Sequence, residues 1–319
     1  MRGMRLFLAF VVLFLTGCAN LRADRFPALR LTQAHPFGAT VVAYNRAGDL
    51  LATGGFDGTL RIWRMPQGIA LISLKNKQDI VRGIAWIDDD DVVSATEDGT
   101  LTIWNLRTHE ARRVIATAAL KAMVGVPASA NFLVAYNSGA LRVYSAAHLS
   151  VIAEHLLDAA PAAIAVSRDG QTIAVATDDR AVRLLNSRLQ VTKTLSPATR
   201  DVLSLRFSPD GKQLAAGTWF KLLLWDMRTG QQTERDTEHF GAIVSIDYTP
   251  DGKDMISLGR ISDSSLRLTD VATGRVRSRM APLPLCGWMV RISPDGHYAA
   301  AGSESGDVDL FDLTQPPPR

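Results

Sequence analysis

The sequence predicts an all-β fold, a ring of seven four-stranded blades known as a β-propeller, and two observations predict it. First, an apolar run, a tight turn and an alternating run recur seven times along the 319 residues, and six of the seven copies end on a bulky residue. Second, successive copies are spaced by 41, 40, 41, 40, 44 and 42 positions, and a period near 40 residues is typical of propellers. These spacings are counted between the closing residues Trp63, Trp104, Tyr144, Leu185, Trp225, Thr269 and Phe311.

The first copy, residues 51–64, shows why the pattern indicates two strands. Its turn contains Asp57 and Gly58, and glycine supplies the positive φ that a tight hairpin turn requires. A single hairpin is barely stable in water. The importance of this hairpin is therefore that the chain repeats it.

Each copy is preceded by a short apolar segment that we predict to be the inner strand of a blade, and it is followed by a more polar outer strand. Residues 110–118 and 274–281 are examples of the outer strands, whose lower hydrophobicity fits an exposed rim. Several inner segments end in a Pro-Asp-Gly turn, in which proline presets φ and glycine supplies φ > 0. The predicted inner segments are residues 41–44, 81–86, 122–126, 162–166, 202–207, 243–248 and 289–292.

Several residues of these repeats carry a resemblance to a known family. They are the run Phe207 to Gly211, the turns Asp57-Gly58 and Asp98-Gly99, and the pair Trp225-Asp226. Through them the chain resembles the WD-repeat family over residues 26–313. The resemblance implies a seven-bladed WD-repeat propeller.

The resemblance also implies a polar tetrad that ties the strands of a blade together through shared hydrogen bonds. Blade six keeps His239 and Asp263 but has no tryptophan at the closing position. We therefore interpret these histidines as buried structural partners, because a hydrogen-bonded core histidine is commoner than a catalytic one. In blade one the tetrad consists of His35, Thr53, Asp57 and Trp63.

The ends of the chain indicate how the ring closes. After Phe311 only a few residues precede Pro316 to Pro318, and proline cannot donate to a strand ladder. The last blade would therefore lack its outer strand. Residues 28–33 alternate like a strand and have no partner of their own, so we predict that this N-terminal strand completes the last blade and closes the ring.

The N-terminus has the layout of a secretory signal. Arg2 and Arg5 precede an apolar run, Leu6 to Leu15, that is too short to span a bilayer comfortably. The next residues, Leu15-Thr16-Gly17-Cys18, resemble a bacterial lipobox, which implies cleavage before Cys18 and acylation of this cysteine. Several acyl chains hold a protein on a membrane where one chain would not. An uncleaved anchor, or an ordinary signal followed by chance by a cysteine, is the alternative.

These features predict four segments and a location. Residues 1–17 are the lipoprotein signal peptide, 18–25 a lipidated tether, 26–313 the propeller and 314–319 a Pro-rich tail. The residue after Cys18 is alanine rather than aspartate, which favours the outer membrane over the inner membrane. We expect the protein to face the periplasm of a bacterial cell envelope.

Catalytic and metal-binding patterns are weak. The six histidines show no metal-ligand spacing, the run Asp88 to Asp91 fits a solvated acidic turn, and residues 302–306 place Glu304 where a nucleophilic serine would stand. We expect no catalytic residue, no metal and no cofactor. We expect Cys286 to be a buried small hydrophobe, and a reactive thiol is the alternative. A net charge of +3 without a block of Lys and Arg indicates no nucleic-acid partner.

Aromatic side chains at the loops are the candidate binding residues. In the family, the turn between the second and third strands and the loop into the inner strand lie on one face of the ring. Exposed aromatic clusters on such a face mark partner contacts. The alternative is that each aromatic ring packs on the neighbouring blade. The candidates are Phe56, Trp219 and Phe220 at the turns, Phe37, Phe240 and also Trp288 at the loops, and Arg200 as a polar companion.

The sequence therefore predicts a monomeric, lipid-anchored ring that acts as a non-enzymatic scaffold for protein partners in the cell envelope. A rigid ring that displays loops from many blades suits binding without chemistry. One alternative is a small-ligand-binding or hydrolytic propeller that uses the central channel. Another is a sensor or receptor component of an envelope assembly or secretion system.

Overall fold

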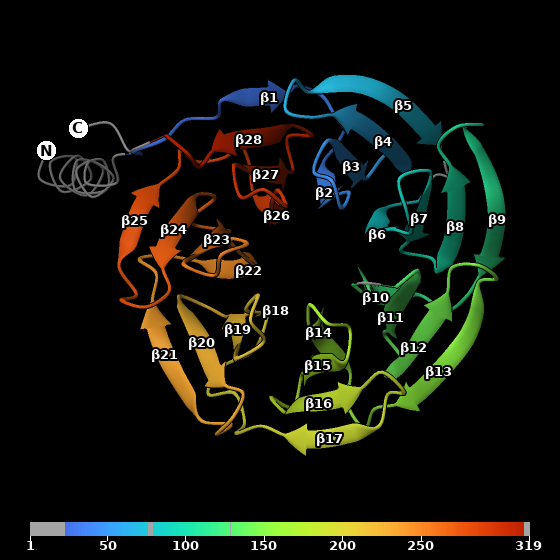
Figure 1. Ribbon diagram of the computed structural model, residues 1–319. Coiled ribbons are helices and arrows are strands. Elements are labelled where there is room, and N and C mark those ends of the chain that lie inside the picture. The colour runs from blue at the N-terminus through green and yellow to red at the C-terminus, as the bar shows by residue number, and fades with distance from the viewer. Residues whose placement is uncertain (1–22, 76–78, 128, 316–319) are drawn as a thin grey trace, which may run out of the picture.

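The computed structural model describes residues 23–75, 79–127 and 129–315, and every regular element in this part of the chain is a β-strand. The strands form seven antiparallel four-stranded sheets, which are the blades of one ring (Figure 1). The predicted all-β, seven-bladed propeller is confirmed. No helix among the described residues is long and apolar enough to cross a membrane.

The inner strands line the centre of the ring, and the second strands follow them outward (Figure 1). Both sets are mostly apolar and buried, because neighbouring blades cover both faces of each sheet. The inner strands of blades one to seven are β2 (Ala39–Tyr44), β6 (Val81–Trp86), β10 (Leu120–Gly125), β14 (Pro161–Val166), β18 (Ser204–Phe207), β22 (Ala242–Tyr248) and β26 (Gly287–Ile292). The second strands are β3 (Leu50–Gly55), β7 (Asp91–Thr96), β11 (Asn131–Tyr136), β15 (Thr172–Thr177), β19 (Gln213–Gly217), β23 (Asp254–Arg260) and β27 (Tyr298–Ser303).

The third strands end on the repeated bulky residues, and the outer strands form the rim. Most side chains of the outer strands are exposed, as their polar sequences predict. The third strands are β4 (Thr59–Arg64), β8 (Thr100–Asn105), β12 (Ala140–Ser145), β16 (Val182–Asn186), β20 (Lys221–Asp226), β24 (Leu266–Asp270) and β28 (Val308–Asp312). The outer strands are β5 (Ile69–Lys75), β9 (Glu110–Ala116), β13 (Ser150–Leu156), β17 (Val191–Thr194), β21 (Gln232–Asp236), β25 (Val276–Arg279) and, for blade seven, β1 (Leu29–Leu31).

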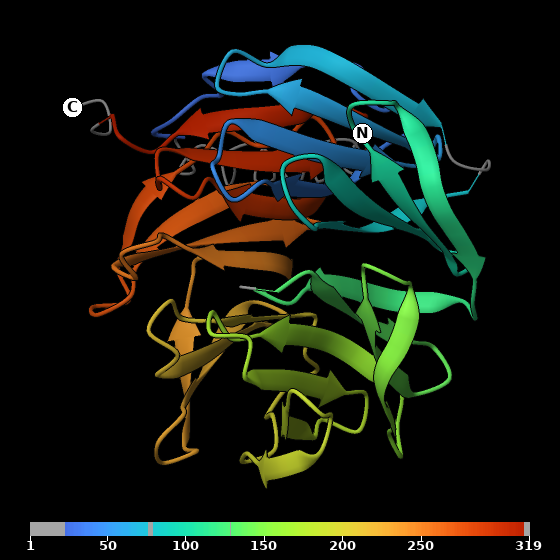
Figure 2. The same ribbon diagram turned by 45° about the vertical axis from the view of Figure 1, so that its right-hand side comes forward.

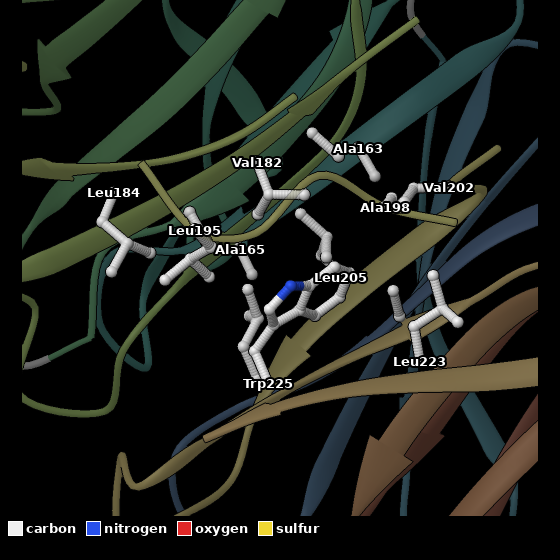
Figure 3. Packing of buried hydrophobic residues seen from close by; sticks show 14 of the residues in the cluster. Ala163, Ala165, Val182, Leu184, Leu195, Ala198, Val202, Leu205, Leu223 and Trp225 are labelled. Carbon is white, nitrogen blue, oxygen red and sulfur yellow. The ribbon is translucent and has the colours of Figure 1, made fainter. Parts of the chain in front are cut away.

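The hydrophobic core is divided among the junctions between adjacent blades. The described residues form seven buried clusters, and each cluster takes its residues from two neighbouring blades. Figure 3 shows the junction of blades four and five, where the indole of Trp225 lies among Val182, Leu195 and Leu205. Trp225 is fully buried, and its Nε1 donates to the carbonyl of Ser196 in the preceding loop at 3.0 Å. Each blade therefore depends on its neighbours for the burial of its faces.

In blade one, a hydrogen-bonded chain links the entry loop, the turn and two strands. His35 Nδ1 lies 2.9 Å from Asp57 Oδ1, and His35 Nε2 lies 2.8 Å from Thr53 Oγ1. Trp63 Nε1 donates to the same Thr53 oxygen at 2.9 Å. A carboxylate only accepts hydrogen bonds, so Nδ1 carries the proton of the imidazole.

Burial sets the charge states of this chain. Desolvation lowers the pKa of His35 below 6.5, although its hydrogen bond to Asp57 opposes the shift. The imidazole of His35 is thus neutral, and its Nε2 accepts a hydrogen bond from the hydroxyl of Thr53. Burial alone raises the pKa of Asp57, but hydrogen bonds from His35, Arg61 and Thr59 outweigh it and hold this pKa well below its ordinary value.

Two other blades keep parts of the arrangement. In blade two, Trp104 Nε1 donates to Ser94 Oγ at 2.8 Å without a histidine. In blade six, His239 lies 2.6 Å from Asp263 and 2.9 Å from Ser257. The sequence analysis did not identify Ser257 as a partner, because a serine in a strand carries no distinctive signal of its own.

The ring is closed by β1, which pairs antiparallel with β28 (Figure 1). Figure 2 shows the same closure from another side, with blue β1 beside the red strands from the end of the chain. The guanidinium of Arg30 binds both carboxylate oxygens of Asp309, with Nε 2.5 Å from Oδ1 and Nη2 2.8 Å from Oδ2. Asp309 is fully buried, whereas the Arg30 side chain is 38% exposed. The closing strand is therefore held by a bidentate ion pair as well as by its ladder.

Among the described residues, the first contact of the N-terminal segment with the ring is made by Asp24. The backbone N–H of Asp24 donates to Arg279 O at 2.6 Å, and the side chain of Arg25 donates to Ser278 Oγ at 3.0 Å. The predicted signal peptide 1–17, Cys18 and the first part of the predicted tether lie outside the described residues, as do Pro316 to Pro318.

We predict that Arg30→Ala lowers the free energy of unfolding by about 2 to 4 kcal/mol, because it leaves the buried carboxylate of Asp309 without its counter-charge. Urea unfolding measures the effect. Arg46→Ala, in an exposed turn of blade one, is the control and is expected to change little. Equal stability of the two variants would contradict the importance of this ion pair.

We also predict that stability falls as the pH is lowered through 6.5. Below this value the unfolded chain protonates His35, while the folded chain, whose His35 pKa is lower, does not. One such group changes the unfolding free energy by at most about 1.4 kcal/mol per pH unit. His35→Gln is expected to show a shallower pH dependence of unfolding, and the exposed His148→Gln an unchanged one. The same slope in all three proteins would refute this role of His35.

Candidate functional site

Two kinds of connection meet on one face of the ring, which we call the loop face. They are the turns between second and third strands and the loops that enter each inner strand. The N–H of Phe56 in a turn donates to Gly38 O in a loop at 3.0 Å, and Glu97 and Asp178 make equivalent bonds in blades two and four. The loop face therefore collects side chains from all seven blades.

Large apolar residues gather on one part of this face. Six of them, each 40% to 84% exposed, lie in the connections of blades five, six, seven and one. With the partly buried Phe56 and Trp288 they form what we call the apolar arc. Ile261 and Leu285 belong to it although the sequence analysis missed them, because a single aliphatic residue in a loop gives no pattern. The six exposed members are Trp219, Phe220, Phe240, Ile261, Leu285 and Phe37.

The blade-five end of the arc is built by a turn that crosses to the next blade. Trp219 forms an antiparallel bridge with Ala242, and the N–H of Phe220 donates to Gly241 O at 3.0 Å. Both partners belong to blade six. The rings of Trp219 and Phe220 contact each other with centroids 5.9 Å apart. This crossing brings the aromatic turn beside the loop that carries Phe240.

Arg200, expected as a companion of these aromatics, has a different partner. Its guanidinium lies 3.5 Å from Glu234 on the outer strand β21. It is thus on the loop into blade five, while the aromatic turn of that blade leans toward blade six. No contact among the described residues joins Arg200 to Trp219 or Phe220.

The other end of the arc is a stacked cluster around Trp288. The guanidinium carbon of Arg260 lies 3.6 Å from the indole centroid, and that of Arg82 lies 5.3 Å from it. Phe56 contacts the indole with a centroid distance of 5.7 Å. These residues come from blades six, two, seven and one. Stacking of guanidinium on indole is favourable, so the cluster ties these connections together.

Each arginine of the cluster is paired with a carboxylate. Arg82 Nη2 lies 2.7 Å from Glu97 Oε2, and Arg260 is ion-paired with Glu304. Phe56 thus packs on a neighbouring blade, the alternative reading of the sequence, and its role is at least partly structural. The indole N–H of Trp288 is shielded from solvent and finds no acceptor among the described residues.

The backbone of the arc is strained at three residues. Phe37, Phe220 and Ile261 have φ values of 70°, 70° and 78°, which side chains with a Cβ rarely adopt. At the equivalent turn of blades one, two, three and seven the chain places glycine, for example Gly58 with φ 68°. Such strain costs of order 1–3 kcal/mol and clusters at functional sites. Six other described residues with a Cβ also have a positive φ, among them Arg180 at the equivalent turn of blade four, so the strain is not confined to the arc.

Polar side chains on the inner strands, at the centre of the ring, bind one another and the backbone of the next blade. On the inner strands of blades five to seven, Asp247 accepts from Arg206 Nε at 2.8 Å and from the N–H of Ile292 at 3.0 Å. Burial, with the nearby Arg206 as second cause, lowers the pKa of Arg291 to about 10. No group of three His, Cys, Asp or Glu able to hold a metal occurs among residues 23–75, 79–127 and 129–315.

Cys286 differs from its expectation, because it is partly exposed rather than buried. It lies at the end of the loop into blade seven, where its carbonyl accepts the N–H of Glu304 at 2.9 Å. The flanking residues Pro284 and Leu285 turn outward, which opens this loop to solvent.

Comparison with known proteins gives consistent results. A family model described as the DDB1- and CUL4-associated factor 12 beta propeller matches residues 10–282. The chain is 23% identical over 301 residues to Periodic tryptophan protein 2 of Arabidopsis thaliana, covering 88% of this chain and 29% of the relative. It is 22% identical over 289 residues to Autophagy-related protein 16 of the same plant, covering 88% and 49%.

A third relative is the Serine-threonine kinase receptor-associated protein of Gallus gallus, 26% identical over 273 residues, covering 82% of this chain and 64% of the relative. The chain spans less than two thirds of the length of each of these three relatives. The similarity thus extends over the propeller of this chain and over only part of each relative.

We predict that Phe220→Gly raises the free energy of unfolding by about 0.5–1 kcal/mol, because glycine adopts a φ of 70° without steric cost. Trp219→Gly is the matched control: its φ is not positive, so the same change is expected to destabilise the protein by about 1 kcal/mol. Denaturant unfolding of both variants measures the difference. A loss of stability in Phe220→Gly comparable to that in Trp219→Gly would show that the turn is not strained.

Proposed function

Because this chain belongs to the WD-repeat β-propeller family, we propose that it is a non-enzymatic scaffold that binds protein partners through its loop face. The observation that carries the proposal is the apolar arc: six large side chains, 40% to 84% exposed, on adjacent connections of four blades. Monomeric soluble proteins rarely expose contiguous apolar patches unless these patches bind something. Trp and Phe are also typical anchors of protein interfaces.

The strain in the arc supports the same proposal. Phe220 stands at a turn position where four other blades have glycine, and it costs stability there. A residue that lowers stability and remains exposed is explained most simply by a contact that is made outside the chain. Partner binding would repay this cost.

We further propose that the ring is held on a membrane through acylated Cys18, on the periplasmic side of a bacterial envelope and with the outer membrane favoured. The support is the residue pattern of the signal and the lipobox, residues 1–18. Since contact with the ring begins at Asp24, only about five residues separate the lipidated cysteine from the propeller. At roughly 3.4 Å per residue, this tether keeps the ring within about 20 Å of the anchor.

A crosslinking pull-down of the full chain from membranes of its host tests both parts of the proposal. The double variant Trp219→Ala with Phe240→Ala is expected to lose the captured partner without loss of folding. Val114→Ala, an exposed apolar residue on the outer strand β9, is the matched control and is expected to retain the partner. Capture that is equal in the double variant and the wild type would refute binding through the loop face.

The same membranes test the anchor. Cys18→Ser is expected to leave the membrane fraction and to keep its signal peptide, which mass spectrometry of the purified chain detects. Unchanged membrane association with normal cleavage would refute the lipoprotein proposal and leave the scaffold proposal intact.

A further inference from the structure

The charges of the loop face are distributed as unevenly as its apolar residues. Around the arc the charged side chains pair with one another: Lys221 lies 2.7 Å from Asp236, while Arg279 is ion-paired with Glu238 and Arg260 with Glu304. The arc therefore presents apolar surface with little net charge. Its complement on a partner is a set of bulky apolar side chains.

Blade four, which adjoins blade five on the side opposite blade six, is different (Figure 1). Asp158, in its entry loop, and Asp178, in its turn, are exposed and form no ion pair with any described residue. The two segments are joined by the bond from the N–H of Asp178 to Ala160 O at 3.0 Å. Arg180, the cation of this turn, is already bound to Asp201 at 2.8 Å. Arg200, in the loop between this turn and the aromatic turn, is paired with Glu234 at 3.5 Å. The unpaired carboxylates of Asp158 and Asp178 therefore make this surface of blade four negative.

We infer, on the basis of the proposed scaffold function, that the occupant of the loop face is a protein segment that carries both bulky apolar anchors and Lys or Arg. The anchors contact Trp219, Phe220 and Phe240. The basic residues reach the carboxylates of Asp158 and Asp178 on the adjacent blade. Charge complementarity of this kind fixes orientation and suppresses wrong partners.

The same charges disfavour a lipid bilayer as the occupant of this face. Surfaces that lie on membranes combine apolar residues with Lys and Arg, which anionic headgroups attract. Here the cations Lys221, Arg260 and Arg279 beside the arc are neutralised by internal pairs, and Asp158 and Asp178 on blade four are exposed without a counter-charge. An anionic membrane would be repelled from blade four rather than bound.

A random peptide library displayed on phage, selected on the full chain purified in detergent, tests the inference. We expect the selected peptides to carry Trp, Phe or Leu together with Lys or Arg. Synthetic copies of one selected peptide, and of the same peptide with each Lys or Arg changed to Glu, are then titrated against the protein. The Glu version is expected to bind at least about tenfold more weakly at low salt and to lose the salt dependence of binding.

Variants of the protein locate the two parts of the interaction. The double variant Trp219→Ala with Phe240→Ala is expected to bind the peptide at least about tenfold more weakly, because it lacks two anchors of the interface. The double variant Asp158→Asn with Asp178→Asn is expected to bind the peptide several-fold more weakly, and most of the salt dependence of binding is expected to disappear. Asp169→Asn, an exposed carboxylate in a turn between inner and second strands, is the matched control and is expected to bind normally.

Selected peptides without basic residues, or normal binding by the Asp158 and Asp178 variant, would overturn the inference. Binding of phosphatidylglycerol vesicles that is lost in the Trp219 and Phe240 variant would overturn it in favour of a membrane. None of these results affects the scaffold proposal if the pull-down still shows partner capture through the loop face. If the Trp219 and Phe240 double variant instead captures the partner as well as the wild type does in the pull-down, the proposed function itself is refuted.

Discussion

Every blade of this protein has two apolar faces, and only a closed ring covers both of them. The seven clusters of buried residues lie at the seven junctions between adjacent blades, so each face is buried by a neighbour rather than by its own sheet. Burial of apolar surface is the dominant favourable contribution to folding. An open ring would leave two faces in water. The pairing of β1 with β28, reinforced by Arg30 and Asp309, is therefore a condition for the stability of the whole ring.

Within a blade, hydrogen bonds between buried polar side chains add to the stability that the apolar junctions provide. The hydrogen-bonded side chains of His35, Thr53, Asp57 and Trp63 pair donors and acceptors that would otherwise be buried in the apolar junctions without a partner. They also connect the entry loop and the turn on the loop face to the strands beneath them. Blades two and six keep parts of this arrangement, and blade three replaces it with a hydrogen bond of 2.7 Å between Tyr136 and Tyr144. The blades thus use different hydrogen-bonded arrangements at equivalent positions.

This rigid support explains how the loop face can carry unfavourable features. Phe220 and Ile261 adopt positive φ values, and large apolar groups stay exposed, without disturbing the strands below. The arc is assembled by contacts between blades: the turn of blade five pairs with blade six, and Trp288 of blade seven stacks on Arg260 of blade six and near Arg82 of blade two. A binding face built in this way is shaped by the ring as a unit. Its apolar and acidic parts belong to adjacent blades, five and four, and the loop that carries Arg200 lies between them.

The sequence by itself determined the elements of this fold. Turn chemistry, strand alternation and a period near 40 residues are local, and the inner strands it predicts agree with the observed ones to within two residues at each end. Even the closing strand was predictable, because Pro316 to Pro318 leave the last blade one strand short. The register of the second and third strands within a blade is equally local: Trp63 lies opposite Leu51 in blade one, and Trp104 lies opposite Val92 in blade two.

Only the tertiary structure decided which side chains meet on the loop face. Arg82 and Trp288 are far apart in sequence and become neighbours because closure of the ring brings blade seven back to blades one and two. Arg200 was expected beside the aromatic turn but binds Glu234, because that turn crosses to blade six. Ile261 and Leu285 join the arc through loop conformations that no local pattern encodes. Contacts across the ring depend on its closure, and closure is a property of all seven blades together.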